Sequence, residues 1–90
     1  LAVVVVDAVP ADDVLQIAEK TARKGMKDAL RGVEVFDVYR GPGVPEGSRS
    51  LALRFRFRAQ DRTLEDQAVD ATMARVAEQL GQRDGISPRG

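Results

Sequence analysis

The sequence predicts an α+β fold in which two amphipathic helices cover one face of an antiparallel β-sheet. Three patterns indicate it. Residues 51–58 alternate between apolar and cationic side chains, as in a strand with one buried and one exposed face. Residues 11–24 and 64–80 repeat apolar side chains at helical spacing. Two more apolar runs, residues 1–6 and 33–39, are short and rich in β-branched or aromatic residues, as strands are.

The composition limits both the size of the fold and its chemistry. The chain has 90 residues, enough for one domain, and 43% of them are hydrophobic, as in a globular protein. It has no cysteine and no histidine, which excludes disulfides and thiolate metal sites and removes the usual general base. We therefore predict no catalytic or metal-binding residue. Because the chain starts without methionine inside a strand pattern, we expect residues 1–90 to be one domain from a longer protein.

The first half of the chain predicts a strand, a helix and a second strand. Residues 1–6 form an almost continuous β-branched run, too short to cross a membrane and typical of a central strand. Pro10 suits a helix start, so a helix is expected from Ala11 to Lys24. Residues 26–32 are interpreted as a turn ending at Gly32, and Val33–Tyr39 as the next strand. The helix is expected to bury Val14, Ile17, Ala18 and Thr21.

The second half predicts a long loop, a strand, a helix and a short edge strand. Residues 41–47 contain three glycines and two prolines and must form a loop. After the strand Leu51–Arg58, Thr63 is expected to cap a helix over residues 64–80. This helix is expected to bury Val69, Thr72, Met73, Val76 and Leu80. Ile86 fits a last strand, which Pro88 restricts to a sheet edge. The order β–α–β–β–α–(β) is that of a ferredoxin-like two-layer sandwich.

Side-chain alternation predicts which residues face away from the helices. The alternating apolar side chains of residues 51–58 are Leu51, Leu53, Phe55 and Phe57. Exposed together they would form an aggregation-prone surface, so they must face the helices. The opposite side then carries Ser50, Arg54, Arg56 and Arg58. In the preceding strand, Phe36 and Val38 are expected in the core, and Asp37 and Tyr39 on the exposed side. Val33 and Val35 have the opposite parity, which indicates a bulge or a partly covered outer face.

Charge is concentrated in the middle of the chain. Residues 40–62 carry six arginines and two acidic residues, a net +4, whereas each flanking segment carries −2 and the total is zero. Two interpretations of this arginine row are open. The arginines can simply keep an exposed strand soluble and prevent it from pairing with another chain. Alternatively, together with Tyr39 they can bind RNA, because unpaired bases stack on aromatic rings and guanidinium groups while arginines hold phosphates.

One segment resembles a known family closely. Residues 36–47 (FDVYRGPGVPEG), followed by Ser50-Leu51-Ala52, are similar to the ferredoxin-fold anticodon-binding domain that ends the β subunit of bacterial phenylalanyl-tRNA synthetase. The similarity extends to LAVVV at residues 1–5, VPA at residues 9–11 and RTL at residues 62–64. The tail, residues 82–90, departs from the family's usual final strand.

The resemblance implies a function for the sheet surface. The family's parent enzyme is a cytoplasmic α₂β₂ ligase that attaches phenylalanine to its tRNA with ATP and magnesium, and its catalytic site is in the α subunit. The domain itself would be non-catalytic and would contact the anticodon stem-loop of that tRNA. Tyr39 would stack on the first anticodon base, a guanine, and Asp37 would accept hydrogen bonds from that base. Ser50 falls on the same motif. Arg54, Arg56 and Arg40 would hold the nearby backbone, an expectation that for Arg54 and Arg56 comes mainly from parity.

Three other kinds of protein have this fold. An ACT-type small-molecule regulatory or dimerisation module is the main alternative, but the turn Asp7–Pro10 lacks the glycine that such ligand sites favour. An acylphosphatase-like enzyme needs an asparagine, and the chain has none. A classical RNA-recognition motif needs exposed aromatic residues on its central strands, whereas Phe55 and Phe57 have the parity of the core.

Overall fold

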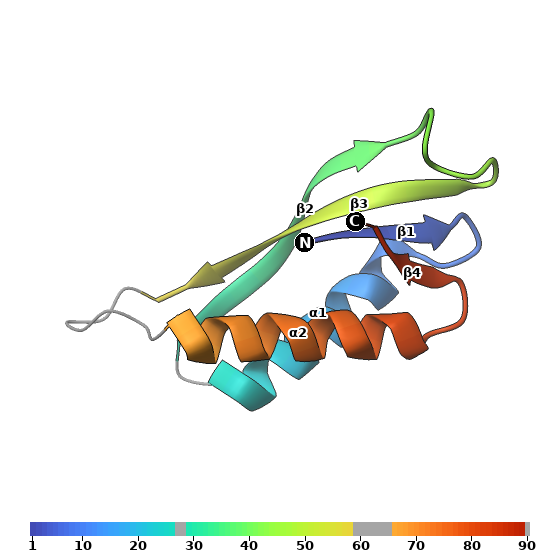
Figure 1. Cartoon of the computed structure of the whole chain (residues 1–90). Coiled ribbons are helices and arrows are strands. Elements are labelled where there is room, and N and C mark those ends of the chain that lie inside the picture. The colour runs from blue at the N-terminus through green and yellow to red at the C-terminus, as the bar shows by residue number, and fades with distance from the viewer. Residues whose placement is uncertain (27–28, 59–65, 90) are drawn as a thin grey trace.

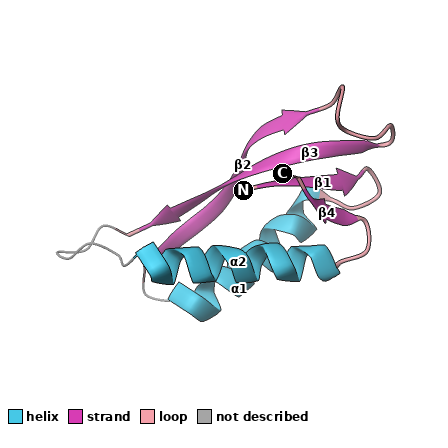
Figure 2. Ribbon diagram, in the orientation of Figure 1, coloured by secondary structure: helices cyan, strands magenta, loops and turns pink. Residues whose placement is uncertain are grey.

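The computed structural model describes residues 1–26, 29–58 and 66–89. Its elements are β1 (Ala2–Val6), α1 (Ala11–Met26), β2 (Leu30–Tyr39), β3 (Ser48–Phe57), α2 (Asp66–Gln82) and β4 (Ile86–Pro88). Both helices lie against the same face of a four-stranded sheet (Figure 1). Helices and strands thus form two layers, as Figure 2 shows, which confirms the predicted ferredoxin-like sandwich.

The strands follow the order β2-β3-β1-β4, and every neighbouring pair is antiparallel. The first strand in sequence is therefore central, and β4 is an edge strand paired only with β1. Pro88 of β4 lies opposite Val3. Because proline has no N–H to donate to a further strand, its position at the edge is the one expected from the sequence.

The core lies between the sheet and the helices. Val3 and Val5 of β1 and Leu51 and Leu53 of β3 point into it, because alternate residues of a strand share a face. The helices contribute side chains spaced three or four residues apart. From α1 these are Val14, Ala18, Ala22 and Met26, and from α2 they are Thr72, Val76 and Leu80. The predicted stripes are confirmed in part, because Ile17 and Thr21 of α1 and Val69 and Met73 of α2 are only half-buried.

A β-bulge in β2 overturns part of the predicted core. Val35 pairs with Leu53 but Asp37 pairs with Ala52, so Phe36 is an extra residue. Val33 and Val35 therefore pack against the core. The prediction that Phe36 and Val38 are buried is wrong: they are 52% and 55% exposed. The bulge interrupts the alternation of side chains at Phe36, so Phe36 does not point into the core. Val38 keeps the helix-facing parity opposite Leu51, but its end of β2 bends away from the helices (Figure 1).

The boundaries of the elements differ slightly from those predicted. Strand β2 begins at Leu30, so Gly32 lies inside the strand and does not end a turn. Helix α2 continues to Gln82, two residues beyond the expected end. The predicted cap, Thr63, and the predicted start of that helix lie outside the described residues.

Candidate nucleic-acid interface

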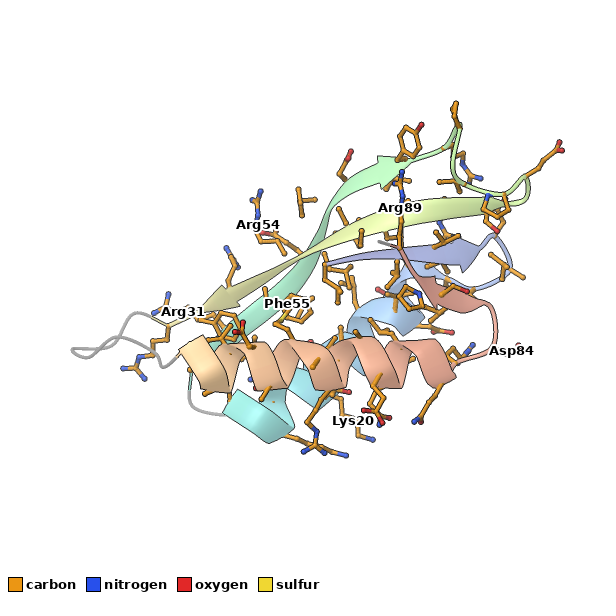
Figure 3. All side chains as sticks on the ribbon, in the orientation of Figure 1. Lys20, Arg31, Arg54, Phe55, Asp84 and Arg89 are labelled. Carbon is orange, nitrogen blue, oxygen red and sulfur yellow. The ribbon has the colours of Figure 1, made fainter. Side chains whose placement is uncertain are left out.

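The side of the sheet that faces away from the helices, here called the open face, carries most of the predicted site residues. Alternation along β3 produces it. Figure 3 shows Arg54 directed away from the helices and Phe55 directed toward them. Arg54 lies opposite Glu34 in the ladder, Arg56 opposite Gly32, and Ala52 opposite Asp37. The open face therefore joins Asp37 and Tyr39 of β2 with Arg54 and Arg56 of β3, as the sequence predicts.

Tyr39 is held in place at the end of β2. Its hydroxyl donates a hydrogen bond to the Pro42 carbonyl oxygen at 3.1 Å. Gly41 follows with φ +146°, and a Cβ on Gly41 would lie 3.0 Å from the Tyr39 hydroxyl oxygen. The glycine therefore allows the loop to turn against the ring. The Arg89 Cζ lies 4.9 Å from the ring centre, within the range of a cation–π contact.

The accessibility expected of Ser50 is not found. Ser50 lies opposite both Tyr39 and Val4, so its parity is that of the open face, yet only 3% of it is exposed. The backbone of Arg89 bonds to Ala2 of β1, whereas its guanidinium group reaches Tyr39 on β2. The Arg89 side chain must therefore cross the middle of the sheet, where Ser50 lies, and in Figure 3 it rises over the strands.

Arg54 and Phe36 form a second contact between a cation and a ring. The Arg54 Cζ lies 4.6 Å from the centre of the Phe36 ring. One guanidinium nitrogen of Arg54 lies 3.9 Å from a carboxylate oxygen of Glu34, a long ion pair between two half-exposed side chains. This contact directs Phe36 toward the open face. The bulge thus turns a residue that was expected in the core into part of the exposed surface.

Asp37 and Arg56 have no such partners within the described part of the chain. Both are exposed, and neither takes part in an ion pair or a side-chain hydrogen bond between residues that the structure describes. An unpaired carboxylate can accept hydrogen bonds from a ligand without first giving up a partner. Asp37 is therefore available for the role that the sequence predicts.

Arg40 already has a structural partner. Its Nη2 lies 2.9 Å from Oδ1 of Asp7, and its Nη1 donates to Oδ2 of Asp7 and to the Ser48 carbonyl oxygen, both at 3.2 Å. Arg49 lies 3.7 Å from the same carboxylate and donates to the carbonyl oxygens of Val6 and Val9. Arg40 thus ties the end of β2 to the turn after β1. The hydrogen bond from Arg40 and the charges of both arginines lower the pKa of Asp7 below its ordinary value.

This ion pair predicts a pH dependence of stability. A carboxyl whose pKa is depressed in the folded state stabilises the fold above its unfolded pKa of about 3.9, and this contribution is lost as the pH falls through the folded value. Asp7→Asn is therefore expected to lower the unfolding midpoint at pH 7 but to match the parent protein near pH 2. Urea unfolding at both pH values measures this. A difference that persists at pH 2 would show that the carboxylate charge is not its cause.

The sequence did not indicate two residues of this surface, Phe36 and Arg89. The valine parity in β2 indicated a bulge but not its place, so Phe36 was assigned to the core. Arg89 lies in the tail that departs from the family's usual final strand, and nothing in its spacing links it to Tyr39. Its positive charge just after the expected edge strand is the one local feature that could have indicated it.

The helix layer carries a separate feature. A shallow cleft of about 290 Å³ lies between α1 and α2, lined by Ile17, Lys20, Thr21, Lys24, Arg75 and Gln79. It is in the layer opposite the open face and does not belong to the surface described above. Among residues 1–26, 29–58 and 66–89, acidic side chains form no group of three that could hold a metal ion. None of the helices described there is long and apolar enough to span a membrane.

Comparison with known proteins explains the combination of fold and motif. The sequence model of one family, described as the ferredoxin-fold anticodon binding domain, matches residues 1–89. The chain belongs to this family. The match supports the anticodon-binding interpretation over the ACT-type alternative, since it covers almost the whole chain and not only the motif at residues 36–47.

Three curated relatives of this chain are each named phenylalanine–tRNA ligase beta subunit. The protein of Trichormus variabilis is 46% identical over 71 residues, which are 79% of this chain and 9% of the relative. That of a Synechococcus species is 42% identical over 80 residues, 89% of this chain and 10% of the relative. That of Yersinia pestis is 42% identical over 89 residues, 99% of this chain and 11% of the relative. The chain therefore spans about a tenth of the length of these relatives.

Proposed function

We propose that this domain binds the anticodon stem-loop of phenylalanine tRNA through the open face of its sheet. The observation that carries the proposal is the arrangement of Asp37 and Tyr39. They are exposed on the same side of β2, two residues apart, beside the cationic side chains of β3. An aromatic ring, an unpaired hydrogen-bond acceptor and neighbouring arginines are the groups that recognise an unpaired nucleotide.

Each group has a separate role in this proposal. Residues i and i+2 of a strand are about 7 Å apart on one face, so a base stacked on Tyr39 can bring its edge to Asp37. The carboxylate accepts only, which favours the N1–H and N2–H₂ donors of guanine. The hydrogen bond that fixes the Tyr39 hydroxyl to the Pro42 carbonyl oxygen reduces the entropy lost when the base binds.

The arginines supply attraction for the phosphates. Arg54 and Arg56 lie on the strand next to Asp37 and Tyr39, and Arg89 reaches the Tyr39 ring. Arg40 contributes positive charge while it remains paired with Asp7. Ser50 is only 3% exposed, so its part in binding depends on a rearrangement that uncovers it. Because few phosphates are neutralised, we expect weak binding, with non-specific dissociation constants of about 10⁻⁴–10⁻⁶ M.

We further propose that the domain is part of the β subunit of a phenylalanine–tRNA ligase. The names of the relatives and the tenth of their length that it covers support this. The partners would then be the rest of the β subunit and the α subunit of a cytoplasmic α₂β₂ enzyme. ATP and magnesium would act in that enzyme, outside this domain.

Titration of the chain with two anticodon hairpins, followed by NMR, tests the proposal. One hairpin carries guanine at the first anticodon position and the other carries adenine. We expect tighter binding of the guanine hairpin, with shifts clustered at Asp37, Tyr39, Arg54 and Arg56. Asp37→Asn is expected to reduce the preference about 5- to 150-fold, because a specific pair of hydrogen bonds to a base contributes about 1–3 kcal/mol of discrimination.

Asp70→Asn is the matched control. It also removes one exposed carboxylate, but from α2 in the helix layer. It is expected to leave the preference unchanged. Shifts confined to the helices, or none at millimolar RNA, would contradict the proposed surface. Equal binding of the two hairpins would leave a surface that holds phosphates without reading the base.

A further inference from the structure

The geometry points to a second nucleobase site on the open face, formed by Phe36 and Arg54. We infer that it stacks an unpaired nucleotide next to the one bound by Tyr39 and Asp37. The inference rests on the proposed RNA-binding function and adds to it a second base contact. Neither the family match nor the motif comparison assigns Phe36 a role.

The bulge in β2 is the first argument. Without an extra residue, the alternation that buries Val33 and Val35 would place Phe36 on the open face and Asp37 in the helix-facing layer. The bulge allows both Phe36 and Asp37 to face outward, because two residues then oppose one on the partner strand. It therefore places an aromatic ring directly beside the carboxylate that is proposed to read a base. Bulges are common where a strand must re-aim a side chain at a functional site.

The surroundings of Phe36 are the second argument. The ring is half exposed, with Arg54 against it and with the charged side chains of Glu34 and Asp37 on the same face. Val38, the other exposed apolar residue of this strand end, has the opposite parity. The two therefore do not form one apolar patch of the kind that docks against another protein. A single ring among polar groups fits a nucleobase, which has an apolar face and a polar edge.

The contact with Arg54 is the third argument. A guanidinium group 4.6 Å from the ring centre covers part of Phe36 and itself presents a flat surface to solvent. Bases stack on guanidinium groups as well as on aromatic rings, and the positive charge also attracts the phosphate of the bound nucleotide. Arg54 is held only loosely by Glu34 at 3.9 Å, so this ion pair need not oppose binding.

The spacing of the two rings defines the kind of ligand. Phe36 lies at the bulge next to Asp37, which pairs with Ala52, and Tyr39 pairs with Ser50, so the two residues are at least about 7 Å apart along the strand. Neighbouring bases stacked in a helix are only about 3.4 Å apart. Two bases held on these rings therefore cannot stack on each other. The ligand must be an unpaired, splayed stretch of nucleotides, such as a loop, and a base-paired stem does not fit.

Binding to hairpins with a missing base tests this site. Three hairpins are compared by fluorescence anisotropy: the intact anticodon hairpin, one abasic on the 5′ side of the first anticodon guanine, and one abasic on its 3′ side. We expect one abasic hairpin to bind about 5- to 100-fold more weakly than the intact one, the range for losing one base–aromatic stack. Phe36→Ala is expected to weaken binding of the intact hairpin by a similar factor. It is expected not to weaken binding of the affected abasic hairpin any further.

Two other variants separate stacking from packing and charge. Phe36→Leu keeps apolar bulk at the bulge but removes the ring, so it is expected to bind like Phe36→Ala. Arg56→Ala removes one exposed positive charge from β3, the strand that carries Arg54, and is expected to weaken binding of all three hairpins equally. Thermal unfolding of each variant confirms that it is folded.

The outcomes distinguish this inference from the function on which it rests. If Phe36→Ala leaves binding unchanged, or weakens all three hairpins equally, the second base site is wrong. The proposed function still stands in that case, provided that the parent protein prefers the guanine hairpin. If the parent protein binds no hairpin, or binds guanine and adenine hairpins equally, the proposed recognition of the guanine is itself wrong.

Discussion

Replacement of Leu51 by alanine is expected to lower the free energy of unfolding by about 2–5 kcal/mol. Leu51 is 1% exposed and is among the largest fully buried side chains. It lies on β3 between Val3 and Val38, so its truncation leaves a cavity under the middle of the sheet. A domain of this size has a total stability of about 5–15 kcal/mol, so the loss is a large fraction of it. Urea unfolding followed by circular dichroism measures the change.

Val38→Ala is the matched control for Leu51→Ala. Val38 is also an apolar strand residue and is the partner of Leu51 across the ladder, but it is 55% exposed. Substitutions at exposed positions usually change stability by about 0.5 kcal/mol or less. If both variants lose the same amount, the core does not lie where the structure places it.

Gly85→Ala is expected to destabilise the domain by at least about 2 kcal/mol, for two separate reasons. Gly85 precedes β4 and has φ +91°, a conformation that L side chains rarely adopt. In addition, a Cβ on Gly85 would lie 2.7 Å from Cγ2 of Val6 and 3.1 Å from Cγ2 of Val9. The Gly85 carbonyl oxygen also accepts a hydrogen bond from the Val6 N–H at 2.9 Å, so the turn cannot easily move away.

Gly47→Ala separates the two causes. Gly47 has φ +83°, but a Cβ there would meet no atom within 4 Å. It is therefore expected to show the cost of the backbone conformation alone, about 1 kcal/mol or slightly more. The additional loss in Gly85→Ala measures the steric contact with β1 and the turn that follows it. Equal losses in the two variants would mean that this contact relaxes at no cost.

The parts of the fold that the sequence predicted are those with a regular period. Strict alternation placed Leu51 and Leu53 inside and Arg54 and Arg56 outside, and helical spacing placed Val76 and Leu80 in the core. Such patterns are read from neighbouring residues alone, so they need no knowledge of the tertiary structure. Pro88 restricted the last strand to an edge by the same local logic.

The errors arose where a distant residue decides the outcome. Phe36 and the valines around it all favour strands, so composition cannot show which of them is the extra residue of a bulge. Ser50 is buried although it has open-face parity, and the Arg89 guanidinium group that reaches Tyr39, its neighbour across the ladder, comes 39 positions later in the chain. Arg40 was counted as part of the basic surface, but its carboxylate partner, Asp7, is 33 residues earlier. Pairings over such distances leave no periodic signal.

The central position of β1 has a consequence for the order in which the chain folds. Val3 pairs with Leu51 and with Pro88, so the first strand must wait for two partners that come much later. Strands β2 and β3 follow each other directly in the chain, joined by residues 40–47, and can pair as a local hairpin, which takes about 1–10 μs. Pairings between distant residues close more slowly, since more chain entropy is lost before any contact forms. During synthesis on the ribosome, we therefore expect the β2–β3 hairpin to form early and the sheet to be completed only when residues 86–88 emerge.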